Sequence, residues 1–93
     1  MFRLFDVVHL IGEIHSSARR HGLSDEAITH AFEHCIMWVE LGDDPVRVLL
    51  AGPDPAGNLL ELVVMMGKGE EMVIHAMPLR RTTAEALFGG GEE

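Results

Sequence analysis

Hydrophobic residues recur at helical spacing in the N-terminal part of the chain. Across Leu4–Arg20 they stand three or four positions apart, with polar residues on the other side of the helix that this spacing predicts. Gly22 predicts the end of that helix, and Ser24 followed by Asp25 and Glu26 predicts the start of a second. The inner stripe of the second helix comprises Ala27, Ile28, Ala31, Phe32 and Cys35.

After Cys35 the pattern changes to short runs of β-branched and large apolar residues, separated by segments rich in glycine, proline and aspartate. Because the connections are short, consecutive strands are expected to pair antiparallel. The four runs are Ile36–Leu41, Val46–Ala51, Leu59–Met66 and Met72–Met77, and Thr82–Phe88 is a candidate for a short helical turn. The sequence therefore predicts an α+β fold, with two N-terminal helices packed on a four-stranded antiparallel meander.

Alternation along the last three strands predicts two different sheet faces. The even-numbered positions are all apolar, so we expect them to pack on the helices; they are Val46, Val48, Leu50, Leu60, Leu62, Val64, Met66, Met72, Ile74 and Ala76. The odd face is also largely apolar, with Val63, Met65 and Met77 among its members. Since little of the chain remains to cover that face, we expect a partner chain or a second copy to bind it.

Three polar residues interrupt the odd face. With turns centred near Pro55 and Gly69, Arg47 and His75 lie beside Val63, and Glu61 is a diagonal neighbour of both. Histidine exchanges protons near neutral pH, and arginine stabilises an anionic transition state. Glutamate orients a neighbouring side chain or accepts a proton. The group therefore predicts either a catalytic site for RNA cleavage or an ion-pair network that satisfies charge on a covered sheet.

Two further residues belong to this prediction through the first hairpin. Its register, as far as the turn signals specify it, places Glu40 opposite Arg47 and puts Trp38 on the odd face. Arg80 and Arg81 would either extend the basic side of the patch or face water.

Composition narrows the classes of function. The 93 residues predict a single domain, 1–88, followed by a flexible acidic tail, 89–93. Fifteen acidic residues against seven Lys and Arg give a net charge of −8, which disfavours RNA and favours a basic protein partner. A single cysteine, the lack of an N-terminal signal pattern and the lack of a long apolar run predict a cytoplasmic protein without a disulfide framework.

Two other motifs are weaker. His30, Glu33 and His34 match the H-x-x-E-H pattern of a zinc protease helix, but a chain this short has no scaffold for a third ligand and a substrate cleft. We interpret them as the polar side of a helix and predict neither a metal nor another cofactor. Cys35 borders an apolar run, which indicates a buried thiol and not a nucleophile.

The order of the motifs resembles a known family. Arg20-His21-Gly22-Leu23-Ser24 is similar to the basic-His-Gly-Val-Ser segment of BrnT-type toxins of bacterial toxin–antitoxin systems. Arg47, a strand ending in Gly52, and Gly57 before an apolar strand are similar to the next segment of that family. Val73-Ile74-His75-Ala76-Met77 resembles its closing Ile-Ile-Ser-Ala-Arg, with His75 in place of serine and Met77 in place of arginine.

The resemblance implies a RelE-like ribonuclease fold and an inhibitory antitoxin, often with a ribbon-helix-helix DNA-binding domain. It implies a functional role for Arg47 and a lesser one for Arg20, and Arg80 is the candidate to replace the missing arginine. The first hypothesis is thus a toxin-like, metal-independent ribonuclease that inhibits translation, using Arg47, His75 and Glu61. The second is a non-enzymatic interaction module that binds a partner or forms a homodimer.

Overall fold

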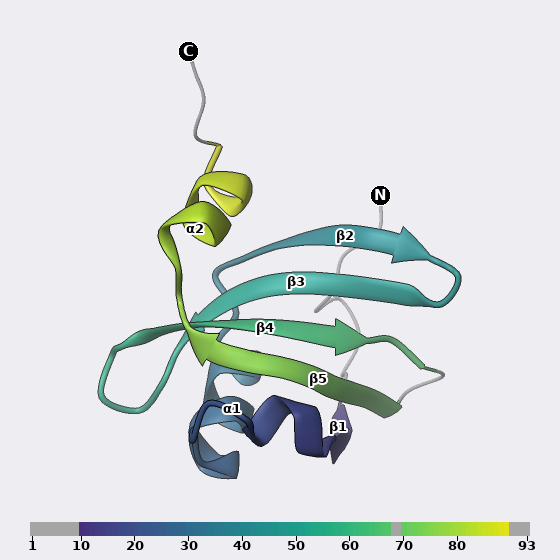
Figure 1. The fold of residues 1–93 in the computed structure, drawn as a ribbon, viewed down its shortest axis with the longest axis horizontal. Helices are drawn as coiled ribbons and strands as arrows, with labels where there is room; N and C mark the ends of the chain where they lie inside the picture. Colours follow the sequence, from purple (N-terminus) through teal and green to yellow (C-terminus); the bar gives the residue numbers. More distant parts are fainter. Residues whose placement is uncertain (1–9, 68–69, 90–93) are drawn as a thin grey trace.

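The computed structural model describes residues 10–67 and 70–89, which form a mixed five-stranded sheet with helices on both sides (Figure 1). In Figure 1 the strands lie between α2 at the top and α1 at the bottom. The elements in chain order are β1 (Leu10–Ile14), the 3₁₀ helix η1 (Ser16–Arg19), α1 (Asp25–Glu33), β2 (Met37–Asp43), β3 (Val46–Pro53), β4 (Leu59–Met65), β5 (Glu70–Pro78) and α2 (Arg81–Leu87).

The predicted pair of N-terminal helices on a four-stranded meander is wrong. Residues 10–14, placed in a helix by their spacing, form β1, which pairs parallel with β5 and gives the strand order β1-β5-β4-β3-β2. Residues 16–19 make a single 3₁₀ turn. The predicted helix also covered residues 4–9, which lie outside the described residues, as does the predicted tail apart from Gly89.

A bulge explains why β1 was mistaken for a helix. The register with β5 runs through Ile11 and then Glu13, so Gly12 is an extra residue in the strand. The bulge puts Ile11 and Ile14, three positions apart, on the same face, where both pack against the core. Apolar residues three positions apart also predict a helix. Pairing with β5 is what makes this segment a bulged strand and not a helix.

The second predicted helix is confirmed as α1. Ser24 caps it, and its side chain accepts a hydrogen bond of 3.0 Å from the backbone N–H of Ala27. Ile28, Ala31 and Phe32 are fully buried, as their inner positions predict. The four predicted strands correspond to β2, β3, β4 and β5, and the candidate C-terminal turn is α2.

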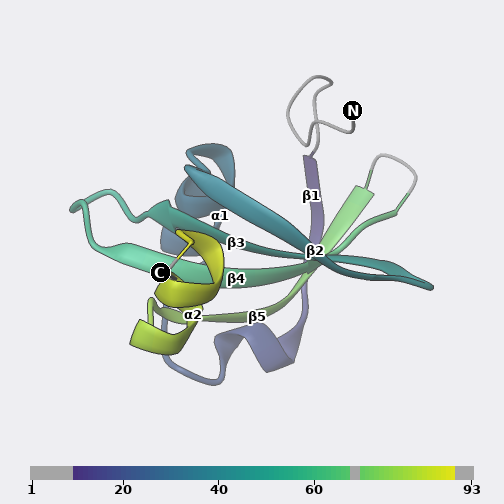
Figure 2. The same cartoon turned by 90° about the horizontal axis from the view of Figure 1, so that it is seen from above.

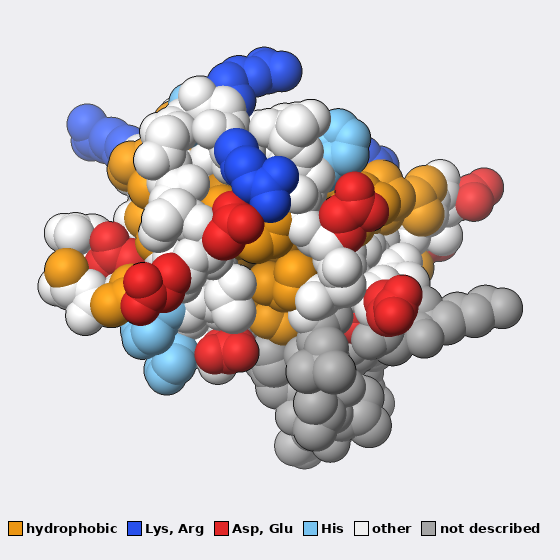
Figure 3. Space-filling model, turned by 90° about the horizontal axis from the view of Figure 1, so that it is seen from below, with side chains coloured by type: hydrophobic (Ala, Val, Ile, Leu, Met, Phe, Trp, Pro, Cys, Tyr) orange, Lys and Arg blue, Asp and Glu red, His pale blue; other side chains and the backbone are white. Residues whose placement is uncertain are grey.

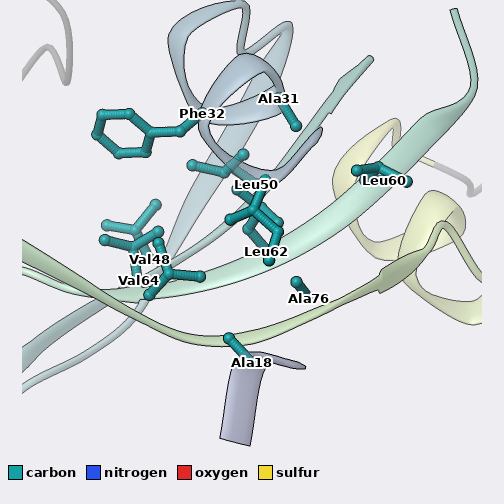
Figure 4. Close-up of a cluster of buried hydrophobic side chains, with 11 residues drawn as sticks. Ala18, Ala31, Phe32, Val48, Leu50, Leu60, Leu62, Val64 and Ala76 are labelled. Atoms are coloured by element: carbon teal, nitrogen blue, oxygen red, sulfur yellow. The ribbon is translucent and has the colours of Figure 1, made fainter. Parts of the chain in front are cut away.

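The core lies between α1, η1 and the even face of the sheet (Figure 4). Most of the even-numbered strand residues are buried there, but in β5 the prediction fails at Met72 and Ile74, which precede Ala76. Val63 pairs with His75 and Val64 with Val73, so Ile74 is an extra residue and Val73 takes the core position. Met72 lies opposite Met65 instead. Fully buried members of the core are Ala18, Ile28, Ala31, Phe32, Val48, Leu50, Leu60, Leu62, Val64, Val73 and Ala76.

The segment after β1 holds this bulge in place. The hydroxyl of Ser17 donates a 2.6 Å hydrogen bond to the carbonyl of Ile74, and the backbone N–H of His15 donates to the carbonyl of Val73 at 2.9 Å. These bonds keep η1 along the outer edge of β5 (Figure 2). They also set the position of the loop that follows η1.

Gly52 lets α1 approach β3 closely. A Cβ atom at this position would lie 2.1 Å from the carbonyl oxygen of Ala31. We therefore expect Gly52→Ala to lower the free energy of unfolding by roughly 1–3 kcal/mol, measured by urea denaturation. Ala56→Ser, in the exposed turn that follows, is the control and should change little. Equal stability of Gly52→Ala and the unaltered chain would contradict the close helix–strand contact.

Candidate functional site

A buried carboxylate lies at the centre of the site. Glu61 on β4 is fully buried, and α2 begins directly beside it. Its Oε2 accepts hydrogen bonds from Nη2 of Arg80 at 2.6 Å and from Nε2 of His75 at 2.9 Å. Its Oε1 accepts from the backbone N–H of Arg80 at 3.0 Å, and the side chain of Thr83 adds another bond.

These bonds decide the ionisation of Glu61. Burial by itself raises the pKa of the carboxyl, but the hydrogen bonds from Arg80, Thr83 and His75 outweigh it and lower the pKa to about 2. The carboxylate is therefore charged at neutral pH. An ionised carboxylate only accepts hydrogen bonds, so Nε2 of His75 must carry a proton. In neutral His75 the lone pair is then on Nδ1.

The local sequence explains how Arg80 reaches Glu61. Pro78 ends β5, and Arg80 is the N-cap residue of α2, two positions later. The side chain of Arg80 does not cap the helix, so Glu61 supplies the acceptor for the N-cap N–H and contacts Thr83 in the first turn. Glu61 thus joins α2 to the sheet as well as holding His75.

A second imidazole lies next to His75. The ring of His21, in the loop after η1, makes an edge-to-face contact with the ring of His75 at a centroid distance of 5.9 Å. The side chain of His75 is 27% exposed, and His21 is exposed. The arrangement places two solvent-accessible proton-exchanging groups beside a guanidinium, which is suited to general acid–base chemistry on an anionic group.

Of the predicted catalytic residues, the structure brings together His75 and Glu61 but not Arg47. Leu49, not Arg47, is in register with Val63 and His75, and Arg47 lies opposite Met65 at the far end of β3. The predicted alignment of Arg47 with Val63 and His75 is therefore wrong. Arg80 is the arginine that contacts Glu61.

The predicted arrangement of the first hairpin is also wrong. Trp38 pairs with Leu50 and packs against the core on the α1 side, so it is not on the odd face. Glu40 pairs with Val48, and Gly42 lies opposite Arg47. A register shift between Glu40 and Gly42 is the physical reason, because it offsets the pairing by one residue.

The apolar residues predicted to bind a partner lie around the acid–base group. Val63 pairs with His75, Met77 pairs with Glu61, and Met65 lies opposite Met72. All three predicted residues are half-buried, the neighbouring Ala51 and Glu61 are fully buried, and Glu61 contacts the first turn of α2. Their role in binding stays a prediction, as does that of Arg20, which is exposed and directly precedes His21.

His21 is the site residue that sequence reasoning missed as a chemical group. His21 lies in the Arg20–Ser24 segment that resembles BrnT-type toxins, but nothing in the strand pattern predicted that it would lie near His75. The one local signal for its position was the glycine after it. Gly22 has a φ of +82° and turns the chain shortly after η1. The contact itself depends on Ser17 holding η1 against β5.

The histidines of α1 have structural partners. Nδ1 of His30 bonds to the carbonyl of Pro53 at 2.7 Å, and Nδ1 of His34 bonds to the carbonyl of His30 at 2.9 Å. Their rings stack at 4.0 Å. Within residues 10–67 and 70–89, no group of three or more His, Cys, Asp or Glu side chains could hold a metal ion.

Cys35 is protected by its surroundings. Burial raises the pKa of its thiol to about 11, although a hydrogen bond with the backbone of Met37 acts in the opposite direction. Only the thiolate reacts with alkylating agents, so we expect labelling by iodoacetamide at pH 8 to be roughly a hundredfold slower than for free cysteine. Labelling of the folded protein at the rate of free cysteine would contradict this assignment.

A hollow of about 500 Å³ lies between β1, η1 and α1. Ile11, Ile14 and Phe32 contribute apolar surface. In Figure 3 acidic side chains flank the hydrophobic side chains at the centre of the face, and a basic side chain lies beside them. Arg19 and Asp25 at the rim bind each other at 2.9 Å, so their charges are already paired. The hollow therefore offers less chemistry than the group around Glu61.

No family model matches the chain, and no curated protein or solved structure matches it either. The resemblance to BrnT-type toxins therefore stays a prediction. None of the helices in the described part of the chain has the length and apolarity to cross a bilayer.

Proposed function

We propose that the chain is a toxin-like ribonuclease that inhibits translation, with its active site at His75, His21 and Arg80. The observation that carries the proposal is the buried Glu61 carboxylate, which binds both His75 and Arg80 while His21 lies against His75. Glu61 acts as a positioning residue, because it is fully buried and saturated with hydrogen bonds.

Three tasks are required for RNA cleavage by internal attack. Nδ1 of His75 accepts the proton of the 2′-hydroxyl as its oxygen bonds to the neighbouring phosphorus. Protonated His21 donates to the 5′-oxygen as the bond from phosphorus to that oxygen breaks. Arg80 binds Glu61 through Nε and Nη2, which leaves Nη1 to stabilise the charged phosphate. The products are a 2′,3′-cyclic phosphate and a 5′-hydroxyl, and two imidazoles supply the acid and the base without a metal ion.

The local charge also supports an anionic substrate. The whole chain has a net charge of −8, which repels RNA at a distance. Three of the seven Lys and Arg residues nevertheless belong to or adjoin this site, since Arg20 precedes His21 and Arg81 follows Arg80. RNA would approach an acidic protein through this basic region.

Cleavage is tested with the purified full-length chain and a 5′-labelled bacterial RNA in the presence of EDTA. We expect fragments that end in a 2′,3′-cyclic phosphate. The matched control substrate is the same RNA with 2′-deoxynucleotides at the mapped cleavage positions, which should resist cleavage there. Intact RNA after incubation with folded protein, together with unchanged amino-acid incorporation in cells that express the chain, would contradict the proposal.

A toxin-like function also predicts an antitoxin. The candidate second function, a non-enzymatic module that binds a partner or itself, is favoured by six exposed large hydrophobic residues in the described part of the chain. His75→Ala separates the two functions. It should abolish inhibition of protein synthesis under the first and leave partner binding unchanged under the second.

A further inference from the structure

The sheet ends at β2 on the side away from β1. Among the described residues, β2 pairs with β3 on one side and no strand pairs with its other side, which we call the β2 edge. An edge strand can pair with another extended chain through N–H and C=O groups on its outer side. Natural proteins usually cover such an edge or shorten it, but β2 is seven residues long.

Exposed apolar residues are concentrated at this edge. Four of the six exposed large hydrophobic residues in the described chain fall in one segment, with exposed fractions of 38–53%: Ile36, Met37, Val39 and Leu41. Met37 and Val39 pair with Ala51 and Leu49, and therefore lie on the side of the sheet that carries α2. An apolar group of this kind on an edge strand is typical of a surface that another chain covers.

The charges around the edge indicate which chain that is. Glu40, Asp43 and Asp44 are all exposed along β2 and the turn after it, and Arg47, opposite Gly42, is the nearest basic residue in the hairpin. A second copy would bring the same three acids and a further net charge of −8 to the contact. A basic partner would instead neutralise them.

We infer that the β2 edge binds an extended, basic segment of another protein, which adds to the sheet as a sixth strand. Alternation fits this partner, because Val39 and Glu40 point to opposite sides of the sheet. A strand of alternating apolar and basic residues places its apolar side chains beside Met37 and Val39 and its basic side chains beside Glu40. The inference does not rest on RNA cleavage, since the β2 edge shares no residue with the site at Glu61.

The test uses the full-length chain labelled with ¹⁵N and a mixture of nine-residue peptides. The peptides alternate lysine or arginine with valine, isoleucine, leucine or phenylalanine. We expect the amide signals of residues 36–44 to shift and the outward amides of β2 to gain protection from hydrogen exchange. A mixture with glutamate in place of the basic residues is the peptide control and should bind at least several-fold more weakly.

A matched pair of variants isolates the charge at the edge. The triple variant Glu40→Lys, Asp43→Lys and Asp44→Lys should bind the basic mixture roughly three- to tenfold more weakly. The control triple variant Glu13→Lys, Glu26→Lys and Glu33→Lys makes the same change in net charge at exposed positions away from β2 and should keep most of the affinity.

Three results would overturn the inference. The first is an absence of shifts in residues 36–44, and the second is equal binding of the basic and acidic mixtures. The third is a dimer, seen by sedimentation at micromolar concentration, that Val39→Asp dissociates, because a second copy would then be what covers the edge. RNA cleavage by the same samples is scored separately, so failure of one proposal leaves the other measurable.

Discussion

Replacing His75 with alanine is expected to slow RNA cleavage by roughly 10²–10⁴-fold, the usual effect of losing a general base. His75 is the best-positioned base in the described chain, because the ionised Glu61 holds its Nε2 and leaves Nδ1 for the substrate. The same substitution should relieve the inhibition of amino-acid incorporation in cells. Cleavage is measured as the initial rate on a labelled RNA at saturating protein, with folding confirmed by circular dichroism.

His34→Ala is the matched control for that result. His34 is exposed on the C-terminal end of α1 and bonds to the carbonyl of His30, away from Glu61. It should leave the rate unchanged, whereas His21→Ala, which removes the proposed general acid, should lower it. A His75→Ala protein that cleaves as fast as the unaltered chain would eliminate this site as the catalytic centre.

Glu61→Gln is expected to lower the free energy of unfolding by about 3 kcal/mol at pH 7. Gln is nearly isosteric with Glu but uncharged, so it resembles the protonated carboxyl. The folded pKa of Glu61 is about 2 against an ordinary value of 4.5, and each pKa unit corresponds to about 1.4 kcal/mol. Urea denaturation at pH 7 measures the change. Asp25→Asn is the control, because the Arg19–Asp25 pair is exposed and should contribute far less.

The pH dependence of stability gives an independent check. Because the folded pKa of Glu61 is depressed, its contribution is fully present above the unfolded pKa of 4.5 and is lost as the pH falls toward about 2. Unaltered protein should therefore lose stability between about pH 5 and pH 2, and Glu61→Gln should lose much less over that interval. Parallel stability curves for the two proteins would show that the bonds to Arg80 and His75 do not hold the carboxylate in its charged form.

Local signals in the sequence determined α1, the four strands after it and their turns. Ser24 with the acids after it specifies a helix start through hydrogen bonds within a few residues. The β3–β4 turn depends likewise on Asp54, whose side chain accepts from the backbone N–H groups of Ala56 and Asn58. Glu61 and His75 could also be assigned to one face, because strand alternation needs only the position of each residue in the chain.

Pairing between distant segments decided the rest. The bulges at Gly12 and Ile74 and the shift between Glu40 and Gly42 each move side chains by one position, and no local signal specifies them. As a result Val73 took the core position predicted for Ile74, and Trp38 turned to the core. Arg47 lies away from His75 for a different reason: the β3–β4 pairing is centred on Ala56 and not on Pro55, so Arg47 is opposite Met65. His21 and Arg80 reach the site because η1 and α2 are held against the sheet by Ser17 and Glu61, bonds that span 57 and 19 residues of the chain. Contacts over such separations depend on the whole packed structure, so only the tertiary structure could assemble the site.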